Sequence, residues 1–465
     1  MTELLNPPTV PRDLTMPPVL GADSRTVVAD GREVRVVQLN NAATTPPFER
    51  TVAEVAEFLG NYGALHRGAG PRARSTVEAV ERAIGRIERF LGQPEGNGLL
   101  FTANTSAAIN VLARLLPLTA DDVVLTSEIE HTSNNLPWRY NTPARVLDVR
   151  ADDGGALDEA HLEALLAEHA GRVRLLAVTG ASNLTGYCPD LAGLAARCHA
   201  AGALLFVDAA QLAPHRRIDM AAAGVDVLAC SAHKIYAPFG LGVLSLPRAV
   251  LDRVPADPGG GSIDMLSDTD TDTGAVVWSP AAERHQTGTW NATGIVALGA
   301  SCATILDTGW EVIEAHERAL VRHTADALAA VDGVRLTVPA GAYATDDRIG
   351  TFPFTVDGLH HALVAAALEH EHGIEVRAGT ICNHRLVRRW AGVDDAGQAR
   401  VEAAIAAGDR LASYGIVRAS LACHSGTDDV ARLVEGLAAL VAHGPRLRYR
   451  PVPAHETYEP VRPTS

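Results

Sequence analysis

The chain has 465 residues, of which 47% are hydrophobic and 5% aromatic, and its formal net charge is −15. This length can bury a large core in two domains, and the acidic balance argues against nucleic acid or an anionic membrane surface as a partner. The first 30 residues lack the apolar stretch of a secretory signal, no run is long enough to span a bilayer, and the six cysteines are spread singly. We therefore expect a cytoplasmic protein without a metal site.

The elements of the N-terminal third can be predicted in chain order. A Pro-rich extension (1–34) leads into a strand at 33–39 and a helix that starts with Pro47 at its first position, followed by a Gly-rich turn. A long amphipathic helix at 72–91 and a strand at 99–102 come next, and then a helix that opens at Thr105.

The start of this last helix is suited to binding a phosphate. Its free backbone amides and the hydroxyls of Thr105 and Ser106 together favour an anion. From spacing alone, a simple capping role for Thr105 is equally good.

Apolar strands alternate with helices in the middle of the chain. We predict strands at 123–125, 175–179, 203–207 and 225–230, with helices at 158–169 and 190–201. This alternation indicates an α/β fold with a mostly parallel sheet and right-handed crossovers.

Two of these strands end in an acid and in a lysine. Asp208 closes one apolar run, and Lys234 comes just after another. The carboxyl ends of parallel strands meet at one edge of the sheet, so both side chains can face one ligand. Pyridoxal phosphate (PLP) needs such a pair, because a lysine holds its aldehyde and a carboxylate keeps its ring nitrogen protonated. Taken singly, each residue would be a solvated lysine or a helix cap; together they favour the cofactor.

The C-terminal part has a different pattern. An exposed loop is expected at 258–273, and helices near 310–330, 361–370 and 427–443 with short strands between them suggest a smaller α/β domain. We expect four regions, which are the extension at 1–34, a large PLP-binding domain at 35–305, a small domain at 306–447 and a tail at 448–465.

The motifs Asp208-Ala-Ala-Gln211 and Ser231-Ala-His-Lys234 resemble those of the class V aminotransferase family of PLP-dependent enzymes, and within it the group II cysteine desulfurases. The resemblance runs from about Leu39 to about His443. It implies the type I fold of PLP-dependent transferases, with a seven-stranded, mostly parallel sheet in the large domain, and a homodimer with shared active sites.

The resemblance also implies a role for each site residue. Lys234, His131 and Cys382 would be catalytic, with His131 stacked on the cofactor ring and Cys382 accepting sulfur. Thr289 would reach the cofactor of the other subunit. The remaining cofactor-binding residues would be Thr105, Ser106, Asn183, Asp208, Gln211, Ser231 and His233. The substrate-binding residues would be His66, Asn183, Arg377 and Arg418.

Departures from the family pattern leave the reaction open. Thr380-Ile381 stands where the family has His-His before Cys382, and a basic segment at 383–390 and a helix-like insertion to about 412 follow. Cys382 could be a packed thiol, and an arginine at a strand start, as expected for Arg418, is more often a surface charge. The basic segment with Trp390 could instead receive a large polar substituent on sulfur.

The predicted function is PLP-dependent cleavage of the C–S bond of L-cysteine or an S-substituted cysteine. Specialised metabolism is at least as plausible a setting as iron–sulfur supply, and a sulfur acceptor protein is a candidate partner. The alternatives are an aminotransferase, a decarboxylating or epimerising enzyme, and a non-catalytic PLP-binding partner subunit.

Overall fold

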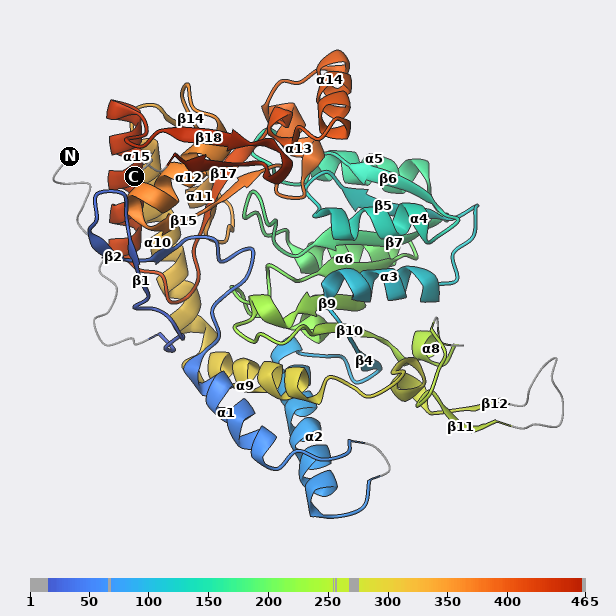
Figure 1. Cartoon of the computed structure of the whole chain (residues 1–465). Helices are drawn as coiled ribbons and strands as arrows, with labels where there is room; N and C mark the ends of the chain where they lie inside the picture. The colour runs from blue at the N-terminus through green and yellow to red at the C-terminus, as the bar shows by residue number, and fades with distance from the viewer. Residues whose placement is uncertain (1–15, 66–67, 254, 256, 267–275, 462–465) are drawn as a thin grey trace.

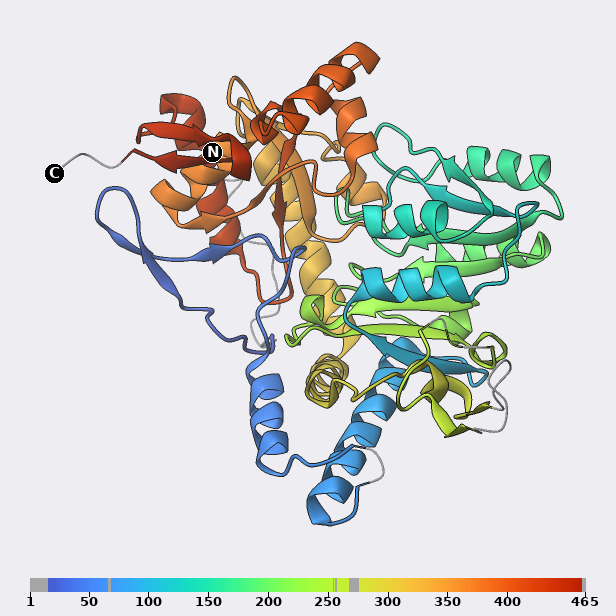
Figure 2. The same cartoon turned by 45° about the vertical axis from the view of Figure 1, so that its right-hand side comes forward.

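The structure is a computed structural model that describes residues 16–65, 68–253, 255, 257–266 and 276–461. It contains a large sheet with helices on both faces and a smaller sheet beside it (Figures 1 and 2). The first 15 residues of the predicted extension, His66, and most of the second half of the expected loop at 258–273 lie outside the described residues.

The large sheet has seven strands and is mostly parallel. From β9 to β6 every neighbouring pair is parallel, whereas β10 runs antiparallel to both of its neighbours. The prediction of a seven-stranded, mostly parallel sheet is therefore confirmed. In spatial order the strands are β4 (Asn97–Thr102), β10 (Gly242–Pro247), β9 (Val227–Ser231), β8 (Leu204–Asp208), β7 (Val173–Thr179), β5 (Val123–Ser127) and β6 (Arg145–Val149).

The large sheet is buried because its strands are apolar on both faces. In β8, Leu205 and Val207 belong to one hydrophobic cluster and Phe206 to another, as the alternation of side chains along a strand requires. The first cluster contains residues of α1 (Glu49–Gly60), α2 (Pro71–Leu91), α5 (Glu159–Glu168), α6 (Leu191–Ala200), α7 (Met220–Ala223) and α9 (Ala292–Thr308). The second contains residues of α3 (Thr105–Leu115), α4 (Leu136–Tyr140) and α8 (Arg248–Leu251).

The smaller sheet is antiparallel and has a hydrophobic cluster of its own. Its order is β13 (Val334–Leu336), β14 (Thr351–Val356), β17 (Ile416–Ser420) and β16 (Arg377–Gly379). The main helices in its cluster are α10 (Trp310–Ala329), α12 (His361–His372) and α15 (Thr427–His443), and α11 is the short helix Ala342–Thr345. Residues 37–39, which precede α1, also join this cluster. Strand β3 (Val37–Gln38) pairs with β15 (Ile374–Glu375), and Leu39 is fully buried in the cluster.

Several segments differ from expectation. Helix α1 begins at Glu49, so Pro47 precedes the helix and does not occupy its first position. Two hairpins were not predicted: β1 (Arg25–Val27) pairs with β2 (Glu33–Arg35), which begins the strand predicted at 33–39, and β18 (Tyr449–Val452) pairs with β19 (Thr457–Pro460) in the predicted tail. Strands β11 (Ile263–Leu266) and β12 (Val276–Trp278) pair within and after the expected loop, and α13 (His384–Trp390) and α14 (Asp395–Ala406) form the helical insertion.

Within the described residues, no single helix has the length and apolarity to cross a membrane. Helices α9 and α10 meet that test only as a pair, and they bend by 81° where they join. Helix α9 packs against α1 and α2 in the protein core.

The close approach of β10 to the start of α3 can be tested by adding one methyl group. A Cβ on Gly242 would lie 2.3 Å from the carbonyl carbon of Asn104, so Gly242→Ala must displace backbone next to the start of α3. We expect a loss of about 1–3 kcal/mol in the free energy of unfolding, measured by urea denaturation. Gly85→Ala is the control, because a Cβ there meets nothing within 4 Å and alanine favours the helix. Equal stability of the two variants would contradict this account.

Candidate active site

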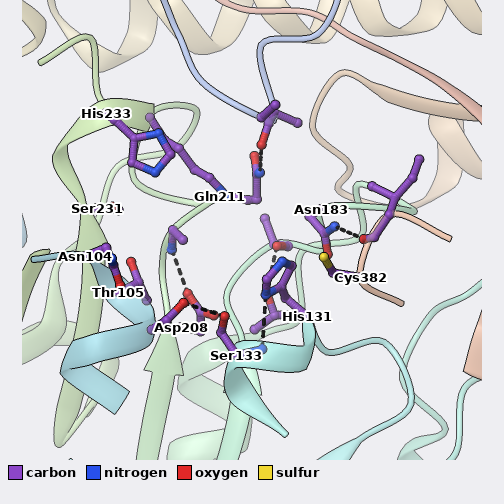
Figure 3. A pocket seen from close by; sticks show the side chains of 18 of the residues that line it. Asn104, Thr105, His131, Ser133, Asn183, Asp208, Gln211, Ser231, His233 and Cys382 are labelled. Carbon is purple, nitrogen blue, oxygen red and sulfur yellow. Dashed lines mark hydrogen bonds between the residues drawn. The ribbon is translucent and has the colours of Figure 1, made fainter. Parts of the chain in front are cut away.

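A cavity of about 440 Å³ lies at the carboxyl edge of the large sheet (Figure 3). The segments that follow β5, β7, β8 and β9 all contribute to its wall, as expected for parallel strands that end at one edge. Twelve of the predicted site residues line it: Thr105, Ser106, His131, Asn183, Asp208, Gln211, Ser231, His233, Lys234, Arg377, Cys382 and Arg418.

Lys234 closes the short 3₁₀ turn η2 (Ala232–Lys234) that follows the fully buried strand β9. Burial lowers the pKa of its amine to about 8, while Asp208 acts in the opposite direction. It is the only lysine among the 40 lysine and arginine residues of the chain. The only side-chain amine in the protein therefore lines this cavity, and a larger share of it is in the neutral, nucleophilic form near neutral pH than for an ordinary lysine.

Asp208 is the last residue of β8 and is 5% exposed. Burial raises the pKa of its carboxyl group, and the Lys234 amine partly offsets that effect. One carboxylate oxygen accepts a hydrogen bond from the Ala210 amide at 3.0 Å. A buried carboxylate of this kind favours a cationic partner, which the protonated ring nitrogen of PLP would supply.

His131 is held in one neutral form. Burial, together with the nearby charges of Lys234 and Arg418, lowers its pKa to about 4. Its Nδ1 accepts a hydrogen bond from the Ser133 amide at 3.1 Å, so the proton of the neutral ring is on Nε2. A neutral, flat ring suits stacking on a pyridine ring.

The loop that carries His131 is fixed by a buried network. Glu130 accepts hydrogen bonds from Ser127 at 2.5 Å and Asn134 at 2.6 Å, and the Asn134 oxygen accepts one from the Trp138 indole at 3.0 Å. Burial raises the pKa of Glu130 to about 8. The residues of this network do not line the cavity, but they hold His131, which does line it, in position.

The start of α3 forms one end of the cavity. Asn104 caps the helix by accepting a hydrogen bond from the Ala107 amide at 2.9 Å, so the capping role belongs to Asn104 and not to Thr105. The Ser106 hydroxyl contacts the Ser133 hydroxyl at 2.5 Å. Thr105 is left with a buried hydroxyl that has no hydrogen-bond partner in the described part of the chain.

The residues present fit PLP, because the cavity wall contains several such unsatisfied polar atoms. Besides Thr105 Oγ1 they are Gln211 Oε1, Ser231 Oγ and Arg418 Nε, all buried and without a partner among the described residues. Buried polar atoms are normally hydrogen-bonded, so these atoms indicate a polar ligand. Thr105 and Ser231 would hold the phosphate, Gln211 a polar group on the ring, and Arg418 a carboxylate.

Arg418 is buried in the middle of β17, not at a strand start. It is 2% exposed, and its guanidinium donates hydrogen bonds to the Asn183 carbonyl at 2.8 Å and to Asn40 Oδ1 at 3.2 Å. Burial and, to a smaller extent, the neighbouring Arg377 lower its pKa to about 9. A buried cation with neutral partners has room for an anion, and a substrate carboxylate fits that need.

Cys382 lines the same cavity and is exposed, so it is not a packed thiol. It lies in a tight turn just before α13. Asn183 and Thr132, which follow strands β7 and β5 of the large sheet, both donate hydrogen bonds to this turn. Thr289 is exposed and does not line the cavity, so its predicted contact with a second subunit stays a prediction.

The arginines of the basic segment after Cys382 form ion pairs that hold α13 in place. Arg385 pairs with Asp148, Arg388 pairs with Asp395 at 2.6 Å, and Arg389 pairs with Glu128 at 2.9 Å. None of these arginines lines the cavity, nor does Trp390. The expectation that this segment could receive a large substituent on sulfur therefore has no support in the site geometry.

The large sheet and the lysine–carboxylate pair at its edge define a PLP-dependent enzyme of the type I fold. The family described as Aminotransferase class-V matches residues 37–433, so the chain belongs to the class V aminotransferase family. This confirms the resemblance.

Known proteins of similar sequence and structure are cysteine desulfurases. One from Dickeya dadantii (strain 3937) is 33% identical over 386 residues, covering 82% of this chain and 85% of the relative. One from Salmonella newport (strain SL254) is 32% identical over 410 residues, covering 86% and 91%. The structures of cysteine desulfurase CsdA (S-sulfonic acid) from Escherichia coli and of the apo enzyme from Thermococcus onnurineus NA1 superpose with TM-scores of 0.72 and 0.76, at 27% and 26% identity, each covering 88% of this chain and 95% of the other.

The lowered pKa of Lys234 predicts how the cofactor-free protein captures PLP. Only the neutral amine attacks the aldehyde, so the capture rate should rise with pH, reach half its maximum near pH 8 and level off about one unit above that. Stopped-flow absorbance of added PLP measures this rate. A rate that still rises steeply toward the ordinary lysine pKa would show that the amine is not desolvated.

Proposed function

We propose that this enzyme removes sulfur from free L-cysteine, with Cys382 as the sulfur acceptor. The observation that carries the proposal is that an exposed thiol, the only lysine and a buried arginine line one cavity. The cysteine desulfurase relatives support the same reaction. An S-substituted cysteine is less favoured, because the arginines of α13 are paired elsewhere.

Each residue has a chemical task in this proposal. Arg418 binds the substrate carboxylate, and Asp208 keeps the cofactor ring nitrogen protonated. Lys234 then takes the α proton on its Nζ, for which a pKa near 8 is well matched to neutral pH. Bound PLP supplies the electron sink for this proton removal.

The sulfur then moves to the protein. The Cys382 thiolate attacks the sulfur of the substrate, so an S–S bond forms while the substrate C–S bond breaks. The electron pair of the C–S bond stays on carbon, which is protonated, and the products are alanine and a persulfide on Cys382. An external thiol is needed to release that sulfur and restore the enzyme.

The wider setting belongs to the same proposal. It includes a homodimer in which Thr289 of each subunit reaches the other cofactor, and the exposed position of Thr289 is consistent with this. It also includes an acceptor protein for the persulfide, with which the exposed Cys382 is consistent, and a cytoplasmic location.

Replacement of Cys382 tests the proposed acceptor. With L-cysteine and dithiothreitol, the wild-type enzyme should release sulfide and alanine in equal amounts, and Cys382→Ala should lose this activity by at least about 100-fold. Cys188→Ala is the control, because Cys188 does not line the cavity. Pyruvate in place of alanine would instead support β-elimination, and full activity of Cys382→Ala would contradict the role of Cys382 as acceptor.

Replacement of Arg418 tests the carboxylate site. Lysine cannot reproduce the forked donors of arginine, so Arg418→Lys should raise the KM for L-cysteine by about tenfold or more. Steady-state kinetics measures the change, with Arg450→Lys on the exposed hairpin as the control. An unchanged KM would place the substrate carboxylate elsewhere.

A further inference from the structure

We propose that Asn183 is a positioning residue for Cys382, because its side-chain amide holds the strained turn that presents the thiol to the cavity. The proposal rests on the proposed function, in which Cys382 accepts the sulfur. It differs from the role that family resemblance implies for Asn183, which is contact with the cofactor or the substrate.

The turn that carries Cys382 has an unfavourable backbone. Ile381 and Cys382 both lie in the left-handed region, with φ of +52° and +56°. This conformation is unusual for any residue with a side chain, and a β-branched residue such as Ile381 is a clear outlier there. Two such residues in succession persist only when the surrounding structure holds them.

The two strained residues are held through their carbonyl groups. The Asn183 side-chain amide donates a hydrogen bond to the Ile381 carbonyl at 3.0 Å, which Figure 3 shows beside Cys382. The Thr132 backbone amide donates one to the Cys382 carbonyl at 3.0 Å. Asn183 and Thr132 follow β7 and β5, so the edge of the large sheet fixes the turn from two adjacent segments.

The far side of the turn is also fixed. The Asn383 amide donates to the Thr380 carbonyl at 2.9 Å, and the Asn383 side chain caps α13. Leu386 and Val387 of α13 are buried in a small cluster with Leu184, the residue next to Asn183. The turn can therefore relax mainly through loss of its contacts on the cavity side.

Asn183 also contacts the arginine that would bind substrate. Its backbone carbonyl accepts a hydrogen bond from Arg418 at 2.8 Å, while its side chain holds the Ile381 carbonyl. One 5%-exposed residue thus links the group that fixes the substrate carboxylate to the turn that carries the thiol. This link fixes the position of the Cys382 sulfur relative to the sulfur of a bound substrate.

The test separates positioning of the thiol from binding of cofactor or substrate. Exchange of the α proton of L-alanine with D₂O needs Lys234 and Arg418 but no thiol, whereas persulfide formation with L-cysteine needs Cys382 as well. We expect Asn183→Ala to slow single-turnover persulfide formation by about tenfold or more, as for loss of one well-placed hydrogen bond, and to change alanine exchange by less than about twofold. Asn97→Ala is the matched control, because Asn97 is also buried and donates its side-chain amide to a backbone carbonyl, that of Asp226, away from the cavity.

Two further measurements report on the turn itself. Glycine adopts positive φ without strain, so adding Ile381→Gly to Asn183→Ala should restore a large part of the persulfide rate. Hydrogen exchange of the Thr132 amide in the PLP-bound enzyme should be faster in Asn183→Ala than in wild type, because its acceptor carbonyl moves.

The outcomes are distinct. If Asn183→Ala loses alanine exchange and persulfide formation to the same extent, the proposal is overturned, and Asn183 instead binds the cofactor or the substrate. Unchanged persulfide formation would also overturn it, because the turn would then be held without Asn183. If wild type forms no persulfide with L-cysteine, the proposed function fails, and the exchange rate of the Thr132 amide still decides whether Asn183 holds the turn.

Discussion

The site depends on one buried pair of opposite charges. Asp208 ends strand β8, and Lys234 comes just after the neighbouring parallel strand β9. Burial opposes the charged form of both side chains. Each group partly offsets the pKa shift of the other, and a ligand that satisfied both groups would offset the remaining cost of burial. The vitamin B6 cofactor of this enzyme family would meet both needs, because its aldehyde could bond to the amine and the carboxylate could keep its ring nitrogen protonated.

Burial of this pair explains much of the surrounding architecture. The apolar strands of the large sheet exclude water from the pair, and β17 of the small sheet contributes Arg418 to the same cavity. Because Arg418 is also buried and unpaired by any carboxylate in the described residues, a single small anion would satisfy its charge. The ion pairs of α13 lie outside the cavity, so the longer segment after Cys382 stabilises the thiol turn and does not widen the substrate site.

Much of this could be predicted from the sequence, because local patterns determine it. The apolar run before Lys234 became β9, and the helix start at Thr105 became α3. Contacts between distant segments could not be predicted: the pairing of Arg385 with Asp148, the burial of Arg418 inside a strand and the C-terminal hairpin all depend on tertiary packing. One available signal was missed, since a chain with a single lysine already marks residue 234 as the site of amine chemistry.

We expect the amine of Lys234 to bind the cofactor covalently. Borohydride reduction of the yellow enzyme followed by peptide mass spectrometry tests it directly, and the single lysine makes the result unambiguous. We expect one reduced cofactor adduct per chain, on the peptide that contains residue 234. Absence of an adduct, or an adduct on the α-amino group alone, would contradict it.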